Sequence, residues 1–311
     1  MSAAPDTRLA EGLFELPGAA DRAILRTVIY ASLFQAPQTL AELHRGLLGV
    51  PLSRTALAAR LRGPFLRGRL GVTDGLVHLR GREDWVTLRH ARRRHSRELL
   101  VRHRKLLAAL ARFPFVRLLA LSGACAHENA ADEDVVVFLI VKRDRCWSVA
   151  LALMLLSKAL GVRRTLCLNY IVDEAQLALP ERDLFTAAEI VGLRPLAGAP
   201  TYRLFIEANR SLAERYPNFL ARQAALCRRL APAGAPRWLE ALLELGPAPL
   251  LEAAARLLLG RRLRRKLGDA PGVDLSPHRL KLHSQDHRPR VGAAFADALR
   301  RYGLDADGMQ A

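Results

Sequence analysis

The segment Val135–Val141, VVVFLIV, has no polar side chain, and five of its seven residues are β-branched. A continuous apolar run of this length predicts a buried strand. Further strands are predicted at 115–121 and 166–172, with helices at 150–160 and 184–191. Strands that alternate with helices over so short a stretch indicate an α/β or α+β sheet domain. We predict an α+β fold.

The residues before this sheet domain have the pattern of three short helices and a β-hairpin. Helical spacing begins at Asp21, a predicted N-cap, and Thr39 and Ser53 are predicted to cap the next two helices. An Asp74-Gly75 pair between apolar runs predicts a two-residue hairpin turn. Together these elements predict a winged helix-turn-helix, a module that binds nucleic acid or docks proteins. The candidate phosphate contacts on its third helix are Arg54, Arg60 and Arg62.

Residues 82–112 are predicted to form one long basic helix. Arginines that include Arg93 and Arg97 give it a positive face, a candidate surface for a nucleic-acid backbone. The alternative is a connecting helix in solvent whose leucines, among them Leu99 and Leu107, pack inward. Both interpretations fit the sequence.

The charge balance bears on the choice of partner. The chain has 48 Lys and Arg residues against 30 Asp and Glu, a formal net charge of +18. This field attracts nucleic acid, nucleotides or an anionic membrane surface, although a basic protein with no polyanion partner has the same composition. Its four cysteines lack zinc-ligand spacing, which predicts reduced thiols in a cytoplasmic protein. The apolar runs are too short for a membrane span, and we recognise no signal peptide.

Beyond residue 201 the pattern is helical. The late HSQDH segment spaces His283 and His287 so that a helix could place both on one metal-binding face, but it lacks the acid of the HExxH arrangement. A capping or packing role is therefore favoured, and no metal site is predicted. The predicted regions are a flexible arm (1–20), a winged-helix-like domain (21–81), the basic connecting helix (82–112), the sheet domain (113–200) and a helical C-terminal region (201–311).

Several motifs occur in a fixed order along most of the chain. They are FPFVRLLALSGA with Asn129 downstream, FLIV followed by Arg-x-Trp, CLNYIVDEAQLALPERDLFTAAEI, RPLAG and EANR…RYPN. This order resembles the nucleotidyltransferase superfamily of the DNA polymerase β type. It is more closely similar to a bacterial group that joins a winged helix to such a domain. The resemblance covers about residues 21–300 and implies a mixed sheet with helices for 113–200.

In that family a Gly-Ser turn holds the triphosphate, and Asp-x-Asp on the next strand holds two Mg²⁺ ions. The resemblance places Ala124 at the serine, and Val135 and Val137 at the two carboxylates. Residues i and i+2 of a strand share a face, so two valines there leave an apolar site that disfavours Mg²⁺. A register one residue earlier would use Asp134 and Val136 and would supply one acid at best. We therefore expect no ordinary nucleotidyl transfer.

Three functions remain open at this point. The favoured one is a pseudo-nucleotidyltransferase that needs no cofactor and binds a nucleotide, a nucleic acid or a protein. The first alternative is an active Mg²⁺-dependent transferase whose relocated carboxylates are Asp132 and Asp134. The second is a winged-helix DNA-binding regulator. Candidate residues for a retained nucleotide, each also explained by a turn, a backbone hydrogen bond or a solvated surface, are Gly123, Ala124, Asn129, Lys142 and Arg145.

Overall fold

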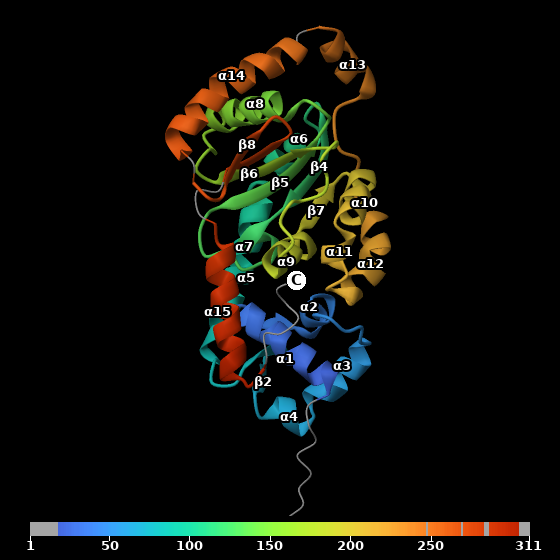
Figure 1. Ribbon diagram of the computed structural model, residues 1–311, viewed down its shortest axis with the longest axis vertical. Coiled ribbons are helices and arrows are strands. Elements are labelled where there is room, and N and C mark those ends of the chain that lie inside the picture. Colours follow the sequence, from blue (N-terminus) through green and yellow to red (C-terminus); the bar gives the residue numbers. More distant parts are fainter. Residues whose placement is uncertain (1–17, 247, 269, 283–285, 305–311) are drawn as a thin grey trace, which may run out of the picture.

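The computed structural model describes residues 18–246, 248–268, 270–282 and 286–304 (Figure 1). The N-terminal part consists of short helices packed on a small antiparallel sheet with the strand order β1-β3-β2. Its elements are α1 (Ala19–Ser32), β1 (Gln38–Thr39), α2 (Leu40–Arg45), α3 (Arg54–Leu61), α4 (Pro64–Arg67), β2 (Leu70–Thr73) and β3 (Leu76–Leu79).

Local sequence chemistry sets several boundaries in this part. Thr39 Oγ1 accepts a hydrogen bond from the Glu42 N–H (3.2 Å), and the Glu42 carboxylate accepts one from the Thr39 N–H (2.8 Å), which makes a reciprocal capping box. Ser53 caps α3 in the same way through its hydroxyl. Asp74 and Gly75 have φ angles of +50° and +74°, as a two-residue hairpin turn requires. These three predictions are confirmed.

The predicted N-cap at Asp21 is wrong. Helix α1 begins at Ala19 with Gly18 at the N-cap, and Asp21 lies inside the first turn. Its carboxylate pairs with Arg60 at 3.0 Å. An acid stabilises the positive end of a helix at either place, so the residue type alone does not identify the cap.

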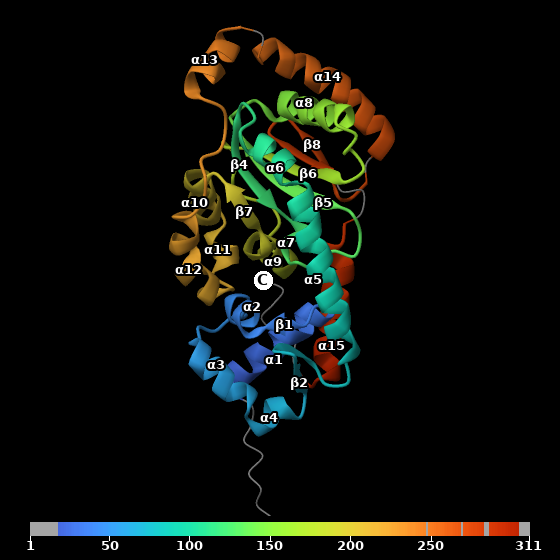
Figure 2. The same ribbon diagram turned by 180° about the vertical axis from the view of Figure 1, so that it is seen from behind.

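The basic segment forms two helices, so the prediction of one helix over 82–112 is wrong. Helices α5 (Asp84–Arg102) and α6 (Arg104–Ala111) meet at His103, which has φ −96° and ψ 8°. Leu99 and Leu107 are buried, as predicted for leucines that pack inward. The break lets α6 lie beside the central sheet while α5 continues toward the N-terminal elements (Figure 2).

A six-stranded mixed sheet forms the centre of the molecule, in the order β7-β4-β5-β6-β9-β8. The pair β5–β6 is parallel and the other neighbouring pairs are antiparallel. The sheet and its helices confirm a mixed α+β architecture, and the predicted buried strand is β5. The strands are β4 (Val116–Leu121), β5 (Val135–Val141), β6 (Leu166–Asp173), β7 (Arg194–Ala197), β8 (Val273–Ser276) and β9 (Arg279–Leu282).

The edges of this sheet depart from the sequence predictions. Strand β7 lies where the sequence analysis predicted no strand. Strands β8 and β9 form a hairpin in the region predicted to be helical, and β9 pairs with β6. The helices around the sheet are α7 (Gly123–Ala126), α8 (Cys146–Ala159), α9 (Leu184–Gly192), α10 (Ala199–Ala208), α11 (Arg210–Ala213), α12 (Pro217–Cys227), α13 (Arg237–Leu245), α14 (Ala248–Leu267) and α15 (Arg288–Arg301).

Each face of the sheet is covered by its own hydrophobic core. On one face Phe138 and Ile140 of β5 pack with α9, α10, α15 and the N-terminal helices. On the other face Val137 and Leu139 pack with α6, α8 and α14. The alternation of side chains along β5 therefore decides which core each residue enters. Within the described residues, no helix combines the length and apolarity that a bilayer crossing needs.

Candidate functional site

The turn between β4 and β5 was expected to bind phosphate. Gly123 begins the four-residue helix α7 with φ +62°, a conformation that favours glycine. The carbonyl of Ala124 accepts a hydrogen bond from the Asn129 N–H (2.8 Å), and the buried Asn129 amide donates to the carbonyl of Phe34 (3.0 Å). Ala124 and Asn129 thus shape the loop and connect it to the end of α1.

The face of β5 next to this turn is not the one that the resemblance indicated. Val135 and Val137 are buried in the core beneath α8 and α14. A Cβ placed on Gly123 would lie 3.7 Å from the side chain of Val136. Val136 therefore lies beside the turn, and Asp134 shares its face because the two residues are two positions apart. One carboxylate at most remains on that face.

The acidic loop before β5 is bound to helix α5 rather than arranged around a metal. Arg93 and Arg97 contact the Glu128 carboxylate at 2.7 and 3.1 Å, and Arg102 contacts Glu133 at 2.8 Å. Burial raises the pKa of the Glu128 carboxyl, but the hydrogen bonds from Arg93 and Arg97 lower it. The net pKa lies below the ordinary value of a glutamate. Much of the positive face predicted for nucleic acid thus neutralises acids of the same chain.

The relocated pair Asp132 and Asp134 has local partners. The Asp134 N–H donates to the Asp132 carboxylate (3.2 Å), which is a common loop motif. Burial first, and then the Asp134 carboxylate, raise the pKa of the Cys167 thiol to about 11. Across the residues that the structure describes, neither aspartate belongs to a cluster of three metal-ligating side chains.

A further acid beside the turn was missed by the sequence analysis. Ser122 donates from its hydroxyl to the Glu189 carboxylate of α9 at 3.2 Å. Burial raises the pKa of Glu189, and the hydrogen bond from Ser122 opposes that rise. Glu189 lies 67 residues from Ser122 in sequence, so no local motif indicates the contact.

The five candidate nucleotide-binding residues do not form one site. Gly123, Ala124 and Asn129 lie near the beginning of β5, whereas Lys142 and Arg145 follow its end. A seven-residue strand separates the two groups by about 20 Å. Lys142 and Arg145 both pair with Glu244 of α13, at 2.7 and 2.9 Å. Those two cations hold α13 against the sheet.

The remaining predicted arginines differ in their surroundings. Arg60 pairs with Asp21, as described above, whereas Arg54 and Arg62 are exposed on and just after α3. These two form no ion pair with any described residue and remain available to an outside anion. The HSQDH segment, for which a capping or packing role was favoured, falls partly on residues 283–285, which lie outside the described residues. Asp286 pairs with Arg288, and His287 precedes α15.

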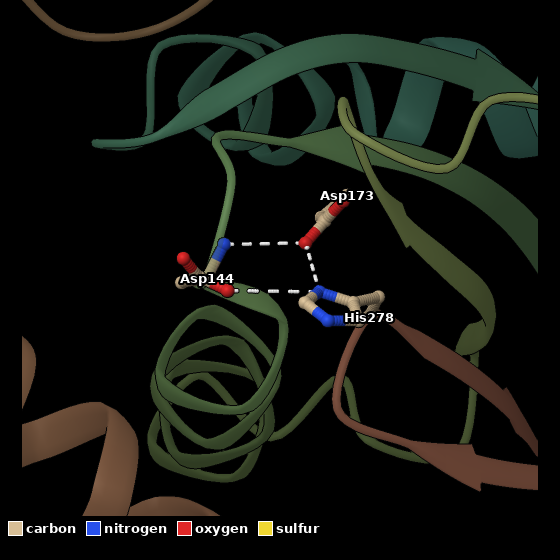
Figure 3. Close-up of side chains that lie close together, drawn as sticks. All are labelled: Asp144, Asp173 and His278. Carbon is tan, nitrogen blue, oxygen red and sulfur yellow. Dashed lines mark hydrogen bonds and ion pairs between the residues drawn. The ribbon is translucent and has the colours of Figure 1, made fainter.

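A second polar cluster lies at the opposite end of β5 and was not predicted (Figure 3). His278, between β8 and β9, places Nδ1 2.7 Å from Asp173 Oδ2 and 3.6 Å from Asp144 Oδ1. Asp173 ends β6, and Asp144 lies in the turn after β5. No sequence motif indicates this cluster, because its members come from separate segments and the region that contains His278 was predicted to be helical.

Comparison with known proteins adds no assignment to this geometry. No family model, curated protein or solved structure matches the chain.

Proposed function

We propose that this chain is a pseudo-nucleotidyltransferase: a protein with the nucleotidyltransferase type of fold that works by binding rather than by nucleotidyl transfer. The succession of β4, the Gly123 turn, α7 and the adjacent antiparallel strand β5 supports the resemblance in fold. The observation that carries the proposal is the face of β5 beside Gly123. The next residue after Asp134 on that face is Val136. That face lacks the second carboxylate of an Asp-x-Asp pair.

The missing carboxylate argues against transfer activity, because phosphoryl-type transfer depends on positioning and charge neutralisation by metal ions. Val136 replaces an anionic ligand by an apolar side chain at the place where the second ion would be shared. Glu189, bonded to Ser122 at the same turn, adds an acid where a triphosphate would need donors. Both features disfavour a bound Mg²⁺–nucleotide complex.

Calorimetric titration with ATP, GTP, CTP and UTP, with and without Mg²⁺, tests this proposal together with a transfer assay. We expect no Mg²⁺-dependent nucleotide binding and no transfer by the natural chain. Val136→Asp should gain Mg²⁺ affinity, because it completes the carboxylate pair with Asp134. Val137→Asp is the matched control; it places a charge in the core and should destabilise the fold without binding metal.

Transfer by the natural chain would overturn the proposal and favour the active alternative. In that case Asp132→Asn and Asp134→Asn should abolish activity. If Val136→Asp folds but gains no Mg²⁺ affinity, the assignment of this face as a former metal site is wrong.

Nucleic acid is the second candidate, because a group of cations on α14 has no acidic partner among the described residues. Arg261, Arg262, Arg265 and Lys266 are exposed and form no ion pair with any described residue. Together with Leu258 they line a surface hollow of about 520 Å³. Unneutralised cations in a row attract a phosphate backbone.

The proposed winged helix offers a second cationic surface with Arg54 and Arg62. It lies at the opposite end of the molecule from α14 (Figure 1). The two surfaces can therefore be tested one at a time.

Binding of duplex DNA and single-stranded RNA, measured against salt concentration, separates these surfaces. Each phosphate-contacting cation that is removed should reduce the salt slope by about 1. We expect Arg262→Ala with Arg265→Ala to reduce it by about 2, and Arg54→Ala with Arg62→Ala to leave it unchanged. The reverse result would favour the winged-helix regulator. If neither probe binds in a salt-dependent way, nucleic acid is excluded and a protein partner remains for this face.

A further inference from the structure

Three polar side chains from distant parts of the chain meet where β5 and β6 end (Figure 3). Asp144, Asp173 and His278 each offer a ligand atom, and these atoms all lie within 4.8 Å of one another. His278 is 105 residues from Asp173 in sequence and reaches it because β9 pairs with β6. The hairpin formed by β8 and β9 therefore completes the cluster.

The spacing of the ligand atoms suits a metal ion of small radius. Ligands about 2.1 Å from a cation, at tetrahedral or octahedral angles, lie roughly 3.0–3.4 Å apart. His278 Nδ1 lies 2.7 Å from Asp173 Oδ2 and 3.6 Å from Asp144 Oδ1, on either side of that range. The ligand atoms of Asp144 and Asp173 lie within 4.8 Å of each other, and rotation of the exposed Asp144 carboxylate can bring the three atoms around one ion.

The surrounding backbone holds the central ligand in place. The Asp173 side chain is completely buried, and its two oxygens accept hydrogen bonds from the Ala175 N–H (2.8 Å) and the Asp144 N–H (3.2 Å). Hydrogen-bonded carboxylates of this kind are typical of metal sites, because the outer contacts orient the ligand. Asp144 is 61% exposed and His278 33%, which leaves an open side for entry and for water ligands.

We propose that Asp144, Asp173 and His278 form a binding site for a divalent transition-metal ion, Zn²⁺ or Mn²⁺. An imidazole with two carboxylates favours these ions over Mg²⁺ and Ca²⁺, which prefer sets of oxygen ligands alone. Two carboxylates and a neutral histidine match the charge of a divalent ion. Nδ1 of His278 binds the ion when the neutral ring carries its proton on Nε2, so a proton on Nδ1 moves to Nε2 when the metal binds.

This site is independent of the proposed function. It lies about 20 Å from the Gly123 turn, at the other end of β5. Loss of metal binding here would leave the Asp134–Val136 face unchanged, and the result of the Val136→Asp experiment does not bear on it.

The test is calorimetric titration of the full, metal-stripped chain with Zn²⁺ and with Mn²⁺. We expect one equivalent to bind, and at least ~10-fold weaker binding in Asp144→Asn and in His278→Gln, because even outer contacts of metal sites change affinity by about that factor. Asp144→Asn changes an exposed side chain, so the fold should remain intact. Circular dichroism checks both variants.

Asp132→Asn with Asp134→Asn is the matched control, since it neutralises two acids elsewhere and should leave the affinity unchanged. The proposal is overturned if the natural chain shows no saturable binding, because the cluster is then a histidine–aspartate ion pair and nothing more. Equal affinity in Asp144→Asn overturns it too. Loss of affinity in the control variant would move the ion to the loop before β5.

Discussion

Helices α5 and α14 are both rich in arginine, yet their cations have opposite surroundings. On α5, Arg89, Arg93 and Arg97 contact Glu42 and Glu128 of neighbouring segments. On α14, the cations at 261, 262, 265 and 266 face solvent and pair with no described acid. Both helices are rich in arginine, and the presence or absence of acidic partners distinguishes them.

The difference follows from how each helix is attached. Helix α14 packs through apolar side chains, and its Glu252 accepts hydrogen bonds from the first N–H groups of α8, those of Trp147 (2.9 Å) and Ser148 (2.8 Å). This attachment does not involve Arg261, Arg262 or Arg265, which pair with no described acid. Helix α5 is attached through its arginines, so its charge supports the structure. Positive charge in a sequence therefore indicates a binding surface only after internal acids have been accounted for.

The largest expected effect tests the structural role of α5. Arg89 is 3% exposed and contacts the Glu42 carboxylate at 2.9 Å. Arg89→Met should lower the free energy of unfolding by about 3–5 kcal/mol, because three carbonyls lose a charged donor and the half-buried Glu42 keeps only Thr39 and Arg93. Urea unfolding measures this. The carbonyls to which Arg89 donates are those of Pro37, His127 and Glu128.

Arg262→Met on α14 is the control and should change stability by less than about 0.5 kcal/mol. Equal losses in the two variants would mean that the contrast between α5 and α14 is wrong.

A smaller effect is expected when the acid that receives two arginines of α5 is neutralised. Glu128→Gln keeps the shape of the side chain but removes the charge that Arg93 and Arg97 contact. We expect a loss of about 1–3 kcal/mol in urea unfolding, the range for hydrogen bonds to charged groups. Glu98→Gln, an exposed acid on α5 itself, should have almost no effect. A stable Glu128→Gln variant would show that this attachment is dispensable.

The same carboxylate predicts a dependence on pH. The pKa of Glu128 lies below its ordinary value in the folded chain, so its contribution is complete above the unfolded pKa near ~4.3 and is lost as pH falls through the folded pKa. The stability difference between the natural chain and Glu128→Gln should therefore shrink between pH 6 and pH 3. Unfolding measured across that range checks this. A constant difference would mean that charge plays no part.

The smallest effect is expected at the exposed end of α5. Arg102 and Glu133 form an ion pair at 2.8 Å, but both side chains are more than half exposed. Arg102→Ala should cost no more than about 1 kcal/mol, as for other surface pairs. Arg265→Ala on α14 should cost still less, because it removes no ion pair with a described residue. A loss above 2 kcal/mol in either variant would extend the structural role of arginine beyond the buried contacts.

Elements whose boundaries depend on nearby residues could be predicted from the sequence. Thr39 and Ser53 cap helices because their hydroxyls reach the next turn, and Asp74-Gly75 adopts the positive φ angles of a tight hairpin. The apolar run at 135–141 is a buried strand for equally local reasons. Strands β7, β8 and β9 were missed, because they form where a neighbouring strand offers hydrogen bonds.

The candidate site also depends on contacts that local sequence does not reveal. Strand β5 is apolar on both faces, so its sequence has no alternation that assigns Val135, Val136 or Val137 to a side. The proximity of Gly123 to Val136 made that assignment and placed Val136, rather than Val135 or Val137, beside the turn. A resemblance can indicate a motif. Which residues of a strand buried on both faces lie on each face is decided by the elements that pack on it.

The sequence by itself determined the mixed architecture, the buried strand, the helix caps and the excess of positive charge, because these depend on residues within a turn or two of each other. Tertiary structure decided which arginines are neutralised, which face of β5 meets the turn, and that Asp144, Asp173 and His278 lie together. Those outcomes depend on strand pairing and on contacts between separate segments, which for Asp173 and His278 lie 105 residues apart. The local sequence pattern does not predict contacts between residues so far apart in the chain.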